Sequence, residues 1–123
     1  MRDSLSRIRD LFHMDVSQLY QSLVDYEEDY RGVLFSPSEK TRIGQRIFGR
    51  IRPALYEKVC VEWGYCAKRQ QPDLQDQLVL AATVADLVTS ACGGIPPFNV
   101  AVLLVRLGLS NLCNCDGDRG KKN

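Results

Sequence analysis

The sequence has little of what catalytic and metal-binding sites are built from. Its only histidine is His13, and no cysteine spacing favours the hydrogen-bonded Cys–His pair that a thiol nucleophile needs. Glycine-rich phosphate loops and paired carboxylates are also missing. The segment at residues 116–118 lacks the remaining ligands of a calcium loop. We therefore predict a protein with no enzymatic activity, no cofactor and no bound metal ion.

We also expect no secretory signal, because residues 1–10 are charged and hold no apolar stretch. The five cysteines do not match the C-x₂₋₄-C pairs of structural zinc sites; they are Cys60, Cys66, Cys92, Cys113 and Cys115. An odd count without a signal favours reduced thiols and a cytoplasmic location. We expect Cys92 to be buried like a small hydrophobic residue, and Cys113 and Cys115 to be exposed.

Excess charge of one sign is also absent. The formal net charge is +1, which argues against a protein that coats nucleic acid by bulk electrostatics. Hydrophobic residues make up 45% and charged residues 25% of the chain, as in ordinary globular proteins. The length of 123 residues suits one domain. We predict a single all-α domain over residues 1–113 and a flexible polar tail over residues 114–123.

Strand-like alternation of apolar and polar residues is absent over any useful length, and nearly every segment spaces its apolar residues as a helix does. Residues 15–18 and 36–39 both match capping boxes, which mark helix starts. The helix after Ser36 carries Gly44 and Gly49, each of which weakens it by roughly 1 kcal/mol unless close packing needs it. Pro53 predicts a break or kink at Arg52.

Two apolar segments fill residues 78–112 and are joined by a turn at residues 93–97. A helix that spans a membrane needs about 20 mostly apolar residues, whereas the first segment carries Asp86 and the second Arg106. We predict that this hairpin is the centre of a compact all-α bundle of five to six helices. An oligomer interface and lipid contact are the alternatives. Antiparallel packing predicts a partly buried ion pair between Asp86 and Arg106, unless both face water.

A run of basic residues is the best candidate for a binding site. It has no acidic member and consists of Lys40, Arg42, Arg46, Arg50 and Arg52. The steps of four from Arg42 to Arg50 place three guanidinium groups in one ridge along a helix. Acidic residues at positions 25 and 27–29 form a complementary run, so the two runs could instead pair within the molecule or face water.

The leading prediction is a small interaction module, an adaptor or a subunit of a complex, that docks through this basic helix face on a protein partner with an acidic surface. One alternative is a helical protein that binds nucleic acid through the same ridge. Another is a membrane-active protein that uses the apolar hairpin, although its length makes a membrane partner the weaker reading. Association of the chain with itself is a further alternative.

Overall fold

The computed structural model of the chain describes residues 2–27, 30 and 32–115. Within these residues the fold is all-helical, as predicted, and no strand occurs. The α-helices are α1 (Arg2–Phe12), α2 (Val16–Val24), α3 (Pro37–Tyr56), α4 (Tyr65–Lys68), α5 (Gln77–Val88), α6 (Pro97–Leu107) and α7 (Leu109–Cys113). A π-helical stretch at Glu57–Glu62 follows α3, and 3₁₀ turns occupy Pro72–Gln75 and Thr89–Ala91.

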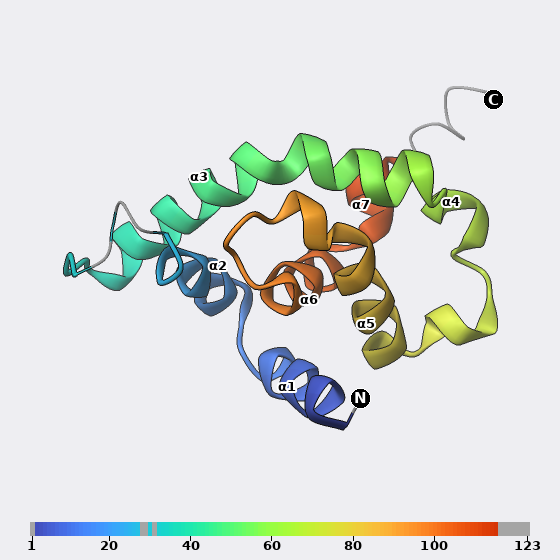
Figure 1. Cartoon of the computed structure of the whole chain (residues 1–123), viewed down its shortest axis with the longest axis horizontal. Helices are drawn as coiled ribbons and strands as arrows, with labels where there is room; N and C mark the ends of the chain where they lie inside the picture. The colour runs from blue at the N-terminus through green and yellow to red at the C-terminus, as the bar shows by residue number, and fades with distance from the viewer. Residues whose placement is uncertain (1, 28–29, 31, 116–123) are drawn as a thin grey trace.

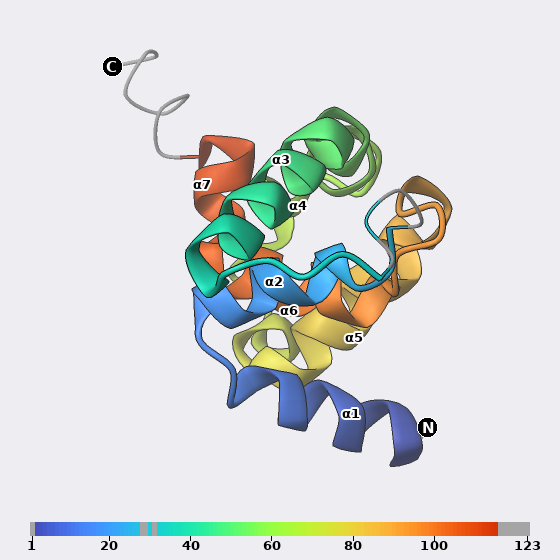
Figure 2. The ribbon, with the colours of Figure 1, turned by 90° about the vertical axis from the view of Figure 1, so that its left-hand side faces the viewer.

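The helices stack in three layers (Figures 1 and 2). The long helix α3 runs along one side, α1 lies on the opposite side, and α2, α5 and α6 fill the space between them. The most extensive contacts between helices join α2 to α3 and α5 to α6. Helix α1 packs on both α5 and α6, and buries Ile8 completely.

Helix α6 is the centre of the bundle. Six consecutive residues from Asn99 to Leu104 are all buried, which requires neighbours on every side of the helix. Those neighbours are α1, α2, α5 and α7. The apolar hairpin is therefore covered by the chain's own helices. None of the helices described is both long enough and apolar enough to cross a bilayer.

The polar residues of this hairpin do not pair as predicted. Arg106 donates from Nη1 to the carbonyl oxygen of Phe12, at 3.0 Å, whereas Asp86 is exposed on α5. No ion pair joins Asp86 to Arg106, so that prediction is wrong; both residues are exposed, which is the alternative that the sequence left open. Asn99 is only 5% exposed, and its amide instead donates to the Ser22 hydroxyl of α2, at 2.9 Å. A buried amide needs such a partner, because an unmade hydrogen bond is costly there.

Helix α3 begins as predicted and continues further than predicted. The Ser36 side chain accepts from the Glu39 amide, and the Glu39 side chain accepts from the Ser36 amide, so the capping box is complete. The second predicted box, at Asp15, is complete as well. Pro53 does not break α3, which runs through it to Tyr56 before the π-helical stretch. A break or kink was predicted at Arg52, and no break occurs there.

The close approach of α2 to α3 depends on Gly44. A Cβ atom at this buried position would overlap the carbonyl oxygen of Tyr20 and lie 2.5 Å from its carbonyl carbon. Gly49, in the same helix, is exposed and has nothing within 4 Å of an added Cβ. The Tyr20 ring meets Phe48 edge-on, with ring centroids 5.9 Å apart. Gly44 is thus needed for the packing of α2 on α3, whereas Gly49 is not.

The cysteines correct the sequence-based expectation. Two disulfides, Cys60–Cys113 and Cys66–Cys115, join the segment around α4 to α7 and the residues after it. Cys113 and Cys115 are buried, although the sequence predicted exposed thiols. Cys92 is the one free cysteine and is buried, as predicted. Because a disulfide joins Cys115 to Cys66, the packed structure extends into the predicted tail. Residues 116–123 of that tail lie outside those described.

Candidate interaction surface on helix α3

Two of the five predicted basic residues are engaged with acidic residues of their own chain. Lys40 lies 2.7 Å from a carboxylate oxygen of Asp25, at the end of α2. Arg50 donates through both terminal nitrogens to the carboxylate of Glu27, at 3.0 and 3.3 Å. The acidic run therefore pairs in part with the basic run, which is the alternative that the sequence left open. Glu28 and Asp29 lie outside the described residues.

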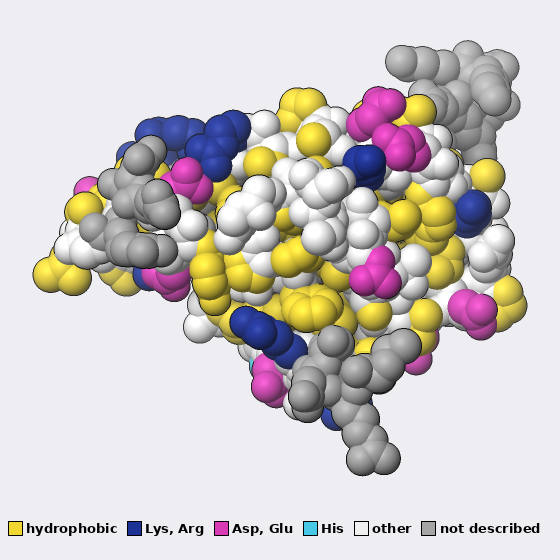
Figure 3. Space-filling view, viewed as in Figure 1, with side chains coloured by type: hydrophobic (Ala, Val, Ile, Leu, Met, Phe, Trp, Pro, Cys, Tyr) yellow, Lys and Arg dark blue, Asp and Glu magenta, His cyan; other side chains and the backbone are white. Residues whose placement is uncertain are grey.

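Arg42 and Arg46 are the exposed remainder of the ridge. They lie one turn apart on α3, and neither forms an ion pair with any residue in the described ranges. With Glu39 and Ile43 they border a shallow hollow of about 230 Å³. Figure 3 shows Lys and Arg side chains gathered over the amino-terminal half of α3. This ridge can accept carboxylates or phosphates as charge-assisted hydrogen-bond partners.

Arg52 faces a different neighbour. Burial raises the pKa of the Tyr20 hydroxyl, and the positive charge of Arg52 opposes that rise in part. The guanidinium of Arg52 is therefore close enough to α2 to interact electrostatically with Tyr20, and Arg52 lies at the side of the ridge. Glu39 is held at the start of the ridge, because hydrogen bonds from the Ser36 side chain and backbone, helped by nearby Arg42, lower the pKa of this carboxyl. It stays ionised at neutral pH.

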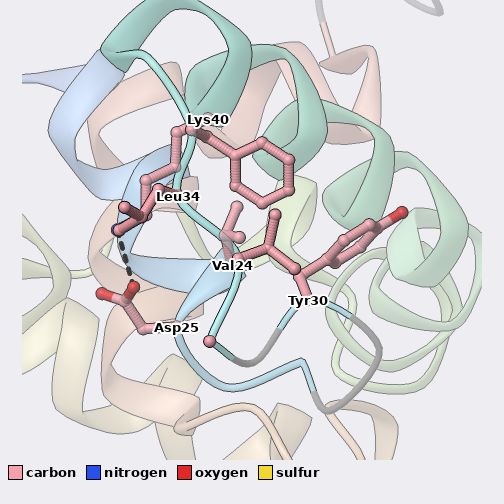
Figure 4. Close-up of a pocket in the computed structure, with 8 residues that line it drawn as sticks. Val24, Asp25, Tyr30, Leu34 and Lys40 are labelled. Carbon is pink, nitrogen blue, oxygen red and sulfur yellow. Dashed lines mark ion pairs between the residues drawn. The ribbon is translucent and has the colours of Figure 1, made fainter.

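An apolar tip lies beside the start of α3, and sequence reasoning missed it. Leu34 is 98% exposed and Val33 is 51% exposed. They line a hollow of about 210 Å³ together with Val24 and Tyr30. Figure 4 shows Lys40 reaching across to Asp25 at the edge of this hollow. The apolar run at residues 33–35, directly before Ser36, was the available signal.

The remaining chemistry-bearing residues do not converge. His13 is exposed at the end of α1. No cluster of three or more His, Cys, Asp or Glu side chains suited to a metal ion occurs in the part of the chain that the structure describes. Comparison of the chain with models of protein families, with curated proteins and with solved structures gave no match.

Proposed function

We propose that this chain is a non-enzymatic interaction module that docks on an acidic protein surface through Arg42 and Arg46. The observation that carries the proposal is that these two exposed guanidinium groups, one helical turn apart, have no ion-pair partner among the residues described. Arginine suits this role because its planar group binds a carboxylate with two parallel hydrogen bonds. Opposite charge on the partner would speed encounter and fix its orientation.

Lys40 and Arg50 play a lesser part in this proposal. Their ion pairs with Asp25 and Glu27 are surface pairs, each of which stabilises the fold by about 0–1 kcal/mol. Their main effect is to fix the loop after α2 beside α3. They therefore shape the edge of the docking surface, and Arg42 and Arg46 are expected to contribute most of the binding.

The test compares two double variants that lose the same charge. Partners are captured from the native source, identified, and purified, and their Kd is measured for Arg42→Ala/Arg46→Ala and for Arg7→Ala/Arg9→Ala. The second pair comes from exposed positions of α1. We expect the ridge variant to bind at least tenfold more weakly and the control to bind within twofold of the wild type. Equal losses in both variants, or none in either, would refute the proposal.

Nucleic acid is the alternative partner for the same ridge, and the salt dependence of binding distinguishes it from a protein partner. Contacts of two arginines with duplex phosphates would give a logarithmic salt slope of about −2. Binding of a 20-base-pair DNA duplex with that slope, lost in Arg42→Ala/Arg46→Ala, would replace the protein partner with nucleic acid. The acidic side chains beside the ridge, Asp25, Glu27 and Glu39, disfavour a uniformly anionic partner, so we expect no such binding.

The two disulfides also bear on where the chain works. Disulfides persist mainly in oxidising compartments and are rare in the cytosol. The cytoplasmic location predicted from an odd cysteine count depended on reduced thiols, so we propose an oxidising compartment instead. Acid quenching of intact cells, followed by alkylation of the chain under denaturing conditions, tests this: one modified cysteine per chain supports the proposal, and five would restore the cytoplasmic prediction.

A further inference from the structure

The outward face of α3 continues into the π-helical stretch and changes its charge along the way. Arg42 and Arg46 are exposed on its amino-terminal half, and Glu57 is exposed eleven residues beyond Arg46, where the π-helical stretch begins. Eleven residues of an α-helix make three turns and about 20°, so Glu57 lies on the same face as Arg46, about 17 Å further along. Figure 3 shows Lys and Arg side chains at one end of this long helix, and Asp and Glu side chains towards the other.

The acidic end of this face is open to a partner. Glu57 forms no ion pair with any residue in the described ranges. Val61 follows it by about one π-helical turn and is 55% exposed. Glu62, beside Val61, lies 3.4 Å from Lys58, and both of these side chains stay partly exposed. This end of the helix therefore presents a carboxylate next to an apolar side chain.

We propose that the acidic surface on which Arg42 and Arg46 dock belongs to a second copy of this chain. This inference rests on the proposed function, because it uses the same two arginines and names their partner. Two copies that lie antiparallel along this face, related by a twofold axis, place Arg46 of each copy opposite Glu57 of the other. A parallel pair would place like charges opposite each other, which disfavours that arrangement.

The same antiparallel register matches the other exposed positions of the face. Arg42 lies opposite Val61, so the alkyl part of the arginine covers the valine. Near the twofold axis Gly49 lies opposite Ala54, and both residues are exposed and small. Arg50, which is also near the axis, is already engaged by an acidic residue of its own chain, which reduces repulsion between the two copies. One register thus pairs opposite charges twice and covers apolar surface at both ends.

Sedimentation velocity of the purified chain, with its disulfides intact, tests the proposal. We expect the wild type to form a dimer at a chain concentration of about 100 µM. Arg46→Glu and Glu57→Arg should each weaken the dimer at least tenfold, because each reversal opposes like charges at two symmetry-related contacts. Arg7→Glu makes the same charge change at an exposed position of α1, on the opposite side of the molecule from α3 (Figures 1 and 2). It should dimerise as the wild type does.

An equimolar mixture of Arg46→Glu and Glu57→Arg is the decisive sample. A dimer of one variant with the other again opposes a carboxylate to a guanidinium group at both ends, so its association should return to within twofold of the wild type. An unfolded variant could not restore association, so the mixture also controls for folding. A wild type that is monomeric, an equal loss in Arg7→Glu, or a mixture that associates no better than the separate variants would overturn the proposal.

Glu57→Arg also separates this inference from the proposed function, because it leaves Arg42 and Arg46 unchanged. A different captured protein would bind Glu57→Arg as tightly as the wild type and would lose affinity only when the arginines are replaced. That result, with a monomeric wild type, would overturn the second copy as partner and keep the proposed function. A wild-type dimer that Arg46→Glu does not weaken, with no loss of a captured partner in Arg42→Ala/Arg46→Ala, would refute both.

Discussion

Replacement of Gly44 by alanine tests the packing of α2 on α3 with a single methyl group. The new Cβ atom would lie 2.5 Å from the carbonyl carbon of Tyr20, whereas carbon atoms in contact are normally about 3.5 Å apart. The obstacle is backbone rather than a movable side chain, so α2 and α3 must separate by about 1 Å. Gly49→Ala is the matched control, because it adds the same methyl group to the same helix in open space.

The two substitutions are expected to change stability in opposite directions. Overpacking of this kind costs about 1–3 kcal/mol, and the upper end applies to Gly44 because backbone cannot rotate away. The gain in helix propensity offsets about 1 kcal/mol, which leaves Gly44→Ala destabilised by about 2 kcal/mol. Gly49→Ala gains helix propensity without overpacking, so we expect it to be more stable than the wild type by about 1 kcal/mol. For 123 residues, these changes correspond to a Tm about 8 °C lower and about 4 °C higher, respectively.

Urea unfolding, followed by circular dichroism without reductant, measures both changes. Equal m-values for wild type and variants would show that the native state stays compact, so that the midpoints report stability alone. A Gly44→Ala variant as stable as Gly49→Ala would refute the reasoning, because the two helices would then tolerate a side chain at the point where they approach most closely.

Two further predictions concern the cysteines. Burial raises the pKa of the Cys92 thiol to about 11; the stability it contributes is complete below its ordinary value of 9.0 and is lost as pH rises towards 11. The free energy of unfolding should therefore fall more between pH 9 and 11 in the wild type than in Cys92→Ala, and a parallel fall would contradict this. Reduction of both disulfides should lower the free energy of unfolding by about 6 kcal/mol: the 53-residue separation of Cys60 and Cys113 accounts for about 4, and the second bridge, which then closes a much shorter loop, for about 2. Urea unfolding with and without reductant measures the loss, and an unchanged midpoint would contradict it.

The helices could be predicted from the sequence where a local signal dominates. Capping residues such as Ser36 accept hydrogen bonds from amides three residues away, so the helix start can be predicted from the adjacent sequence. Helix ends were harder to predict. Gly108 adopts a φ of +99° and separates α6 from α7, although one helix was predicted there. Pro53 stays within α3, because tertiary contacts such as those of buried Leu55 and Val59 can outweigh a local preference.

The disulfides could not be predicted, because they depend on contacts between residues far apart in the chain. Cys60 and Cys66 are separated from their partners by 53 and 49 residues, and sequence alone does not say which side chains meet. An odd count suggested reduced thiols, yet it is equally met by two bridges and one buried thiol at Cys92. The separate expectations had different outcomes: Cys92 is a buried free thiol, as expected, whereas Cys113 and Cys115 are buried in disulfides rather than exposed.

The division of the basic run follows from its position around α3. At 100° per residue, Arg42 and Arg46 both lie about 160° around the helix from Gly44, the point of contact with α2. Lys40 lies only about 40° from Gly44 and Arg50 about 120° from it, so their long side chains reach carboxylates at the end of α2. Once Gly44 is known to face α2, the spacing of residues along α3 therefore predicts which arginines face outward. The glycine that permits the close packing of α2 on α3 thus lies on the face of α3 roughly opposite Arg42 and Arg46, so the packing that buries Gly44 leaves both arginines exposed.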